Sequence, residues 1–208
     1  MGLFLAMSAI VGVDEETALQ ALQGYARSRG GSLTAAELSL EDDGCLVVSA
    51  GVGGTTLLYP GNFLEWDDAS ADLSKRLQKP VFSFHIHDGD LWMYSLYEQG
   101  AVVDQFNPVP DYWGELDDDE MQSWQGNAVE VARRVPGLTP ERIANYFVRW
   151  DLENGYGQKA YPGDQFGSGE DWQLVDFMQK LGFDYPVDDR GEAHGETYEF
   201  RCPSDFAD

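Results

Sequence analysis

Residues 81–94 read VFSFHIHDGDLWMY, and this stretch decides how the first half of the chain folds. Its centre, Asp88-Gly89, is a dipeptide that favours a two-residue hairpin turn. Apolar residues alternate with polar or smaller ones before the turn, and a second run of residues that favour β-strands follows the turn. The stretch therefore predicts two antiparallel strands, at 81–87 and 91–98.

A two-residue turn also predicts which residues face each other across the hairpin: His87 and Asp90, His85 and Trp92, and Ser83 and Tyr94. The opposite face would be core, formed by Phe82, Phe84, Ile86, Leu91 and Met93. The first face mixes polar and aromatic side chains, so it is either a lightly covered sheet surface or the floor of a site. We expect the ligand-binding residues here and on the following loop: His85, His87, Asp90, Trp92, Tyr94 and Trp113.

Two histidines two positions apart on a strand can both ligate one metal ion, and Asp90 could add an oxygen ligand. The order of residues resembles the His-x-His-x-Asp-His run of metallo-β-lactamase-like hydrolases. It departs from that run because the aspartates fall one place early and one place late, and the last histidine is missing. We expect no metal and no other cofactor. A metal-dependent hydrolase using His85, His87 and Asp90 is the alternative.

Outward from the hairpin, the first half of the chain alternates between helical and strand patterns. Asp14 is a suitable N-cap for a helix that stops at Gly30-Gly31, and Pro80 ends a second helix. The expected strands are 2–12, 32–40, 45–50, 55–59, 81–87, 91–98 and 101–106. The first expected helix lies between the Asp14 cap and Gly30-Gly31, and the second covers 68–78. This order predicts an α+β fold, with an antiparallel or mixed sheet, helices on one face, and a ferredoxin-like core with added strands.

The organisation along the chain predicts three regions. Residues 1–110 form the α+β sheet domain, residues 111–183 form a helical region packed on it, and residues 184–208 form an acidic C-terminal tail with one strand-like patch at 196–201. Within the helical region, Thr139-Pro140 is a typical helix start. The buried stripe of that helix would be Ile143, Tyr146, Phe147 and Trp150.

The charge of the chain excludes several partners. It has 208 residues with 37 acidic and 13 basic side chains, a formal net charge of −24. Such a surface repels phosphate groups, so we expect neither nucleic acid nor an anionic membrane as a partner. The acidity is either a salt-adapted, solubilising surface or a surface that attracts a basic partner.

The expected compartment is the cytoplasm. The two cysteines, Cys45 and Cys202, are too few for a disulfide framework and lack zinc-type spacing. The apolar start of the chain has no basic residue before Arg27, so a first strand explains it better than a signal peptide. No stretch approaches 18 apolar residues, the length of a membrane-spanning helix.

Two aromatic and amide-rich stretches, 105–113 and 172–178, either pack the two halves together or line a cleft between them. The segments 81–113 and 170–186 resemble a family of uncharacterised bacterial proteins with no assigned function, which implies no activity, cofactor or site residue. We expect a non-catalytic binding or regulatory protein, such as an immunity or inhibitor protein, that engages a basic protein. A salt-adapted surface around a small-molecule pocket is a third hypothesis.

Overall fold

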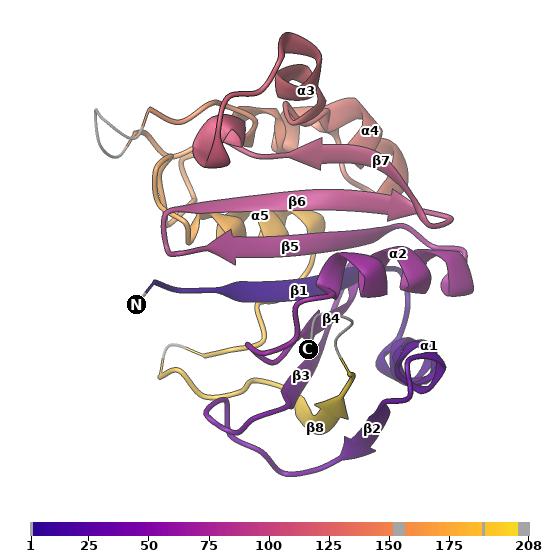
Figure 1. Cartoon of the computed structure of the whole chain (residues 1–208). Helices are drawn as coiled ribbons and strands as arrows, with labels where there is room; N and C mark the ends of the chain where they lie inside the picture. The colour runs from indigo at the N-terminus through magenta and orange to yellow at the C-terminus, as the bar shows by residue number, and fades with distance from the viewer. Residues whose placement is uncertain (1, 152–156, 189, 204–208) are drawn as a thin grey trace.

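The computed structural model describes residues 2–151, 157–188 and 190–203 (Figure 1). These residues form an α+β fold around an eight-stranded antiparallel sheet with the order β2-β8-β3-β4-β1-β5-β6-β7. The strands are β1 (Leu5–Val11), β2 (Ser32–Ala35), β3 (Cys45–Gly51), β4 (Gly54–Leu58), β5 (Val81–His87), β6 (Leu91–Glu98), β7 (Ala101–Phe106) and β8 (Glu196–Arg201). The α-helices are α1 (Glu15–Ser28), α2 (Trp66–Leu77), α3 (Asp118–Ser123), α4 (Ala128–Arg134) and α5 (Gln173–Leu181).

Local signals set the ends of the first two helices. The Asp14 carboxylate accepts a hydrogen bond from the backbone N–H of Thr17 at 2.8 Å, which caps α1. α2 ends at Gln78, which adopts a left-handed conformation with φ of 51° two residues before Pro80. Within the described residues, no helix is long and apolar enough to cross a membrane.

The two helices of the first half, α1 and α2, share one face of the sheet as expected, and α5 from the second half covers the other face. α1 and α2 pack on one face with apolar residues such as Ile10 and Leu57. α5 packs on the other face, where Phe177 joins a larger cluster with Phe82 and Phe84. Figure 1 shows α2 in front of the sheet and α5 behind it. The sheet needs cover on both sides because most of its strands are buried in full rather than in alternation.

The hairpin has one more turn residue than expected, which corrects its register. Asp88 and Gly89 both take positive φ, and the N–H of Asp90 donates to the carbonyl of His87 at 2.9 Å. The ladder resumes only at His87↔Leu91, so Asp90 is an additional residue in the connection. His85 pairs with Met93 and Ser83 with Ser95, while Ile86 pairs with Trp92 and Phe84 with Tyr94.

This register places Trp92 and Tyr94 on the core face with Phe84, because residues that pair across antiparallel strands share a face. Trp92 has no exposed surface and contacts Phe106 and Phe177, with ring centroids 5.1 and 5.2 Å apart. A one-residue shift reverses which residues of β6 reach the core. Burying two large aromatic rings is more favourable than burying Met93 and Ser95 in their place.

The chain after β7 contains less regular helix than expected. The helix expected from Thr139 is wrong: two 3-10 turns, η2 (Pro140–Arg142) and η3 (Ala144–Tyr146), occupy that region. Ile143, Tyr146 and Trp150 are buried as expected, but only Tyr146 lies in a 3-10 turn; Ile143 lies between the two turns and Trp150 follows them. A third 3-10 turn, η1 (Pro110–Trp113), follows β7.

The acidic C-terminal region contributes a strand to the sheet. The strand-like patch at 196–201 is β8, which lies between β2 and β3 and pairs with both in antiparallel register. Its one fully buried side chain is Phe200, in the α1 and α2 cluster. Residue 189 and residues 204–208 of the expected tail lie outside the described residues.

Truncation of the core face of β5 tests this arrangement. Phe84 has no exposed surface, and we expect Phe84→Ala to lower the free energy of unfolding by about 3–5 kcal/mol through loss of buried area and formation of a cavity. His87→Ala on the half-exposed face is expected to cost much less. Denaturant melts of the two variants compare these losses, and equal losses would contradict the assigned faces.

Candidate functional site

The structure divides the six expected ligand-binding residues between two faces. Trp92 and Tyr94 belong to the core: the Trp92 indole N–H donates to Gln173 Oε1 at 3.3 Å, and Tyr94 stacks on Phe177. The prediction that Trp92 and Tyr94 belong to a surface site is therefore wrong. The extra turn residue, Asp90, is the physical cause, because it moves both rings to the α5 side.

The other four residues, His85, His87, Asp90 and Trp113, gather at the turn end of the hairpin on the α2 side. His87 contacts the edge of Trp113, with ring centroids 4.9 Å apart. Nε2 of His85 lies 3.4 Å from Nδ1 of His87. Asp90 joins the group through Tyr112, whose hydroxyl donates to the Asp90 carboxylate at 2.5 Å.

Further rings extend this group into a continuous surface. His85 stacks on Trp66, with centroids 4.6 Å apart and planes 12° from parallel. His87 contacts Phe4 edge to face at 5.0 Å and Tyr112 at 5.7 Å. We call this surface the aromatic patch, and its members are Phe4, Leu64, Trp66, His85, His87, Tyr112 and Trp113.

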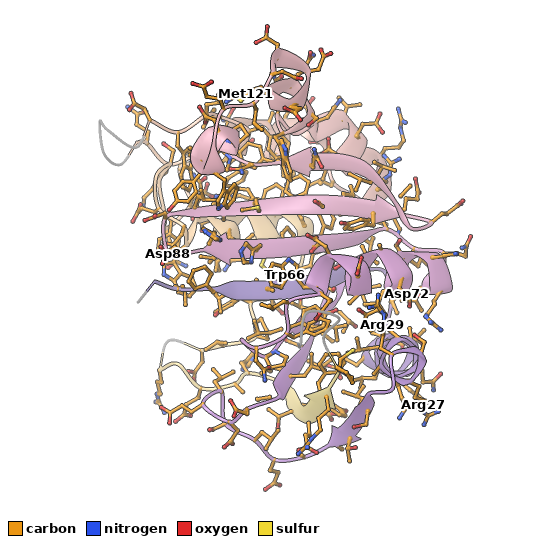
Figure 2. The ribbon with its side chains drawn as sticks, viewed as in Figure 1. Arg27, Arg29, Trp66, Asp72, Asp88 and Met121 are labelled. Carbon is orange, nitrogen blue, oxygen red and sulfur yellow. The ribbon has the colours of Figure 1, made fainter. Side chains whose placement is uncertain are left out.

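The aromatic patch exposes large apolar side chains to solvent. The exposed fractions are 49% for Phe4, 55% for Leu64 and 56% for Trp113. α2 begins at Trp66 and runs away from the hairpin turn, so it covers only one half of β1 and β5 (Figure 1). Figure 2 shows Trp66 at the start of α2 and Asp88 at the far end of the hairpin. The patch occupies the half of this face that α2 leaves open.

A small pocket of about 160 Å³ opens within the aromatic patch. Phe4, Leu64 and Trp66 line it, and His85 is the one titratable side chain among its described lining residues. Such a volume accommodates one apolar or aromatic side chain rather than a large ligand. The pocket is therefore of a size to bind a single side chain of a partner protein.

The surroundings of the aromatic patch are acidic. Residues 80–132 include eleven acidic residues and no lysine or arginine. Asp88, Asp90 and Asp111 are exposed beside the patch. A cation that approaches this end of the molecule meets a negative field without nearby positive charges in this segment.

Sequence reasoning missed Phe4, Leu64 and Trp66. Phe4 reaches the patch because the N–H of Gly89 donates to the carbonyl of Leu3 at 2.9 Å, which ties the start of the chain to the hairpin turn. Leu64 and Trp66 come from the connection between β4 and α2. The sequence shows that the apolar residues Leu64 and Trp66 precede the second expected helix, but nothing in their spacing connects them to the hairpin.

The two aromatic stretches, 105–113 and 172–178, have mainly a packing role. Phe106 and Phe177 both contact Trp92 in the core. Tyr112 and Trp113, at the end of the first stretch, lie instead in the aromatic patch. The two stretches thus join the halves of the chain, and only the end of one reaches the candidate site.

In the described ranges, no group of three or more His, Cys, Asp and Glu side chains is arranged to hold a metal ion. Comparisons with protein-family models, with curated proteins and with solved structures found no match. Function is therefore inferred from the geometry and charge of this chain alone.

The buried imidazole of His85 predicts a pH effect on stability. Burial, with a smaller contribution from His87, lowers the pKa of His85 from 6.5 to about 4. Between these values the unfolded state binds a proton that the folded state does not, so His85 makes stability fall as pH decreases from 6.5 to 4. We expect this contribution to reach at most about 3 kcal/mol.

Urea melts of the wild type and His85→Phe across this pH window measure the effect. The phenylalanine ring retains the stack on Trp66 but cannot titrate, so the variant is expected to lose less stability on acidification. Carboxylate titrations are common to both proteins and cancel in the difference. Parallel pH profiles would contradict a buried, neutral His85.

Proposed function

We propose that this chain is a non-catalytic cytoplasmic binding protein, of the immunity or inhibitor type, that engages a basic protein through the aromatic patch. One observation carries the proposal: Phe4, Leu64 and Trp113 are about half exposed on the half of a sheet face that no described helix covers, and Phe4 and Leu64 line a pocket there. Clustered exposed apolar side chains are typical of interaction sites.

The composition of the aromatic patch fits a protein interface. Tryptophan and tyrosine are enriched among the residues that contribute most to binding energy, and rigid rings lose little conformational freedom on binding. The contacts of His87 with Phe4 and Trp113 hold these rings in place before a partner arrives. An apolar side chain of the partner would fill the pocket beside His85.

The charge of the chain supports a basic partner. A net charge of −24 and the absence of lysine and arginine from residues 80–132 would accelerate association with a positively charged protein. The acidic residues beside the patch would lie at the rim, where charges affect association rate and specificity more than affinity. The apolar centre and the acidic rim together define the expected partner surface: an apolar anchor flanked by lysine or arginine.

We also propose that the sheet contains a ferredoxin-like core. The strand order β3-β4-β1-β5, with α1 and α2 on one face, supports it, because a β-α-β-β-α-β chain with antiparallel neighbours is the ferredoxin-like arrangement. β2 and β8 would then be additions at one edge, and β6 and β7 additions at the other.

Selection from a random peptide library on the immobilised protein tests the proposed function. We expect enrichment of peptides that combine an aromatic or aliphatic residue with neighbouring lysine or arginine. An enriched peptide, measured by fluorescence anisotropy, should bind the Phe4→Ser/Trp113→Ser variant at least about tenfold more weakly, a loss that two hot-spot residues readily produce. Added salt should also weaken binding.

The matched control is Val129→Ser. Val129 on α4 is 55% exposed, similar to Phe4 and Trp113, but lies outside the aromatic patch. We expect this variant to bind the peptide as the wild type does. If enriched peptides bind the Phe4→Ser/Trp113→Ser variant with unchanged affinity, the aromatic patch is not the binding surface.

One observation favours the alternative, a metal-dependent hydrolase. The 3.4 Å between Nε2 of His85 and Nδ1 of His87 is close to the separation of two nitrogens bound to one tetrahedral zinc ion at about 2.0–2.1 Å. Asp90, the third ligand of that hypothesis, instead accepts a hydrogen bond from Tyr112. A zinc hydrolase would require Asp90 to exchange Tyr112 for the metal.

Isothermal titration of zinc into the protein, repeated with His85→Ala, separates the two functions. We expect no binding at one equivalent, because two histidines without a third protein ligand hold zinc weakly. Tight binding at one equivalent that His85→Ala abolishes would favour the hydrolase and overturn the proposed binding function.

A further inference from the structure

A second pocket, of about 580 Å³, lies beside α5 and shares no residue with the aromatic patch. Three half-buried aromatic side chains line it: Phe166, Trp172 and Tyr185. Two exposed carboxylates, Asp184 and Asp188, and the exposed His194 also line it. No lysine or arginine is among its lining residues. Among the described residues, aromatic walls with carboxylates and no lining lysine or arginine distinguish this pocket from an ordinary apolar depression.

The aromatic walls are held by the main chain and by buried side chains. The buried carboxylate of Asp176 accepts hydrogen bonds from the N–H groups of Gln165 and Phe166 at 2.9 and 2.8 Å, which positions Phe166. Trp172 immediately precedes α5, and Tyr185 follows the left-handed Gly182 that ends it. The rings of Trp172 and Tyr185 lie 5.5 Å apart at 77°, so they form two adjoining walls of a corner.

The carboxylates give the pocket a negative potential. Hydrogen bonds from the N–H groups of Glu192 and Arg190, with a weaker contribution from His194, keep the pKa of Asp188 below its usual value, so its side chain stays ionised at neutral pH. Lys180, the cation on α5, is engaged elsewhere by Asp164 at 2.7 Å. An anionic ligand would therefore be repelled, and a cationic one attracted.

We infer that this pocket binds an organic cation with a methylated ammonium group. Aromatic faces attract cations through their quadrupole, and cages of aromatic rings are the usual recognition site for quaternary ammonium ions. A methylated ammonium needs few hydrogen-bond acceptors, so it fits walls made of rings better than a primary amine does. The carboxylates at the rim add attraction over a longer range.

Titration with choline and with 3,3-dimethylbutan-1-ol tests the inference. The alcohol has the same shape as choline, with a neutral carbon in place of the charged nitrogen. We expect saturable choline binding, seen in the NMR signal of the Trp172 indole N–H, and binding of the alcohol that is at least about tenfold weaker. A peptide with trimethyl-lysine, compared with its unmodified form, shows whether the cation is best presented by a protein; preference for the trimethylated form over the unmodified form also supports the inference.

Matched variants assign the binding to the pocket. Trp172→Ala should abolish choline binding, and Tyr185→Phe, which retains the ring, should preserve it. Should Trp172→Ala fail to fold, the exposed double variant Asp184→Asn/Asp188→Asn replaces it and is expected to weaken choline binding. Equal affinity for choline and the alcohol, or no saturable binding of either choline or the trimethylated peptide, would overturn the inference. Neither result bears on the aromatic patch, because the two sites share no residue.

Discussion

The extra residue in the turn between β5 and β6 is the constraint on which the rest of the structure depends. Because Asp90 lies outside the ladder, Ile86 pairs with Trp92 and Phe84 with Tyr94. These rings then form the centre of the cluster on which Phe106 and Phe177 pack. The second half of the chain thus attaches to the sheet through two aromatic side chains whose side was decided by one turn residue.

Buried polar contacts also help to hold the second half of the chain against the sheet. Asp164 is buried and accepts hydrogen bonds from the Tyr146 hydroxyl at 2.8 Å and the Tyr161 N–H at 3.0 Å, while Lys180 supplies the compensating charge. A buried carboxylate is costly without such partners. These contacts hold the 3-10 turns and the loop before α5 where regular helical hydrogen bonds are few.

The opposite face of the sheet is covered incompletely, and this difference leaves the aromatic patch exposed. α1 and α2 bury a compact cluster, but α2 begins at Trp66 and leaves the turn end of β5 open. The hydrogen bond between Leu3 and Gly89 brings Phe4 to this space, and η1 brings Trp113. The two rings fill the space only in part. The net charge of −24 makes copies of the chain repel one another, which opposes self-association through these exposed rings.

The sequence alone determined most of the secondary structure and the charge. Strands β5, β6 and β7 have the bounds that alternation and turn residues predict, and β8 matches the strand-like patch at 196–201, because these signals are local. The ring stack of Trp66 on His85 and the burial of Trp92 required the tertiary structure. The dipeptide Asp88-Gly89 predicts a turn, but it does not show whether the turn has two residues or three. The length of the turn determines which residues of β6 face the core. The three-residue turn is compatible with the fold because the rings that it places on the core side pack against Phe106 and Phe177, and no local pattern in the hairpin records that packing.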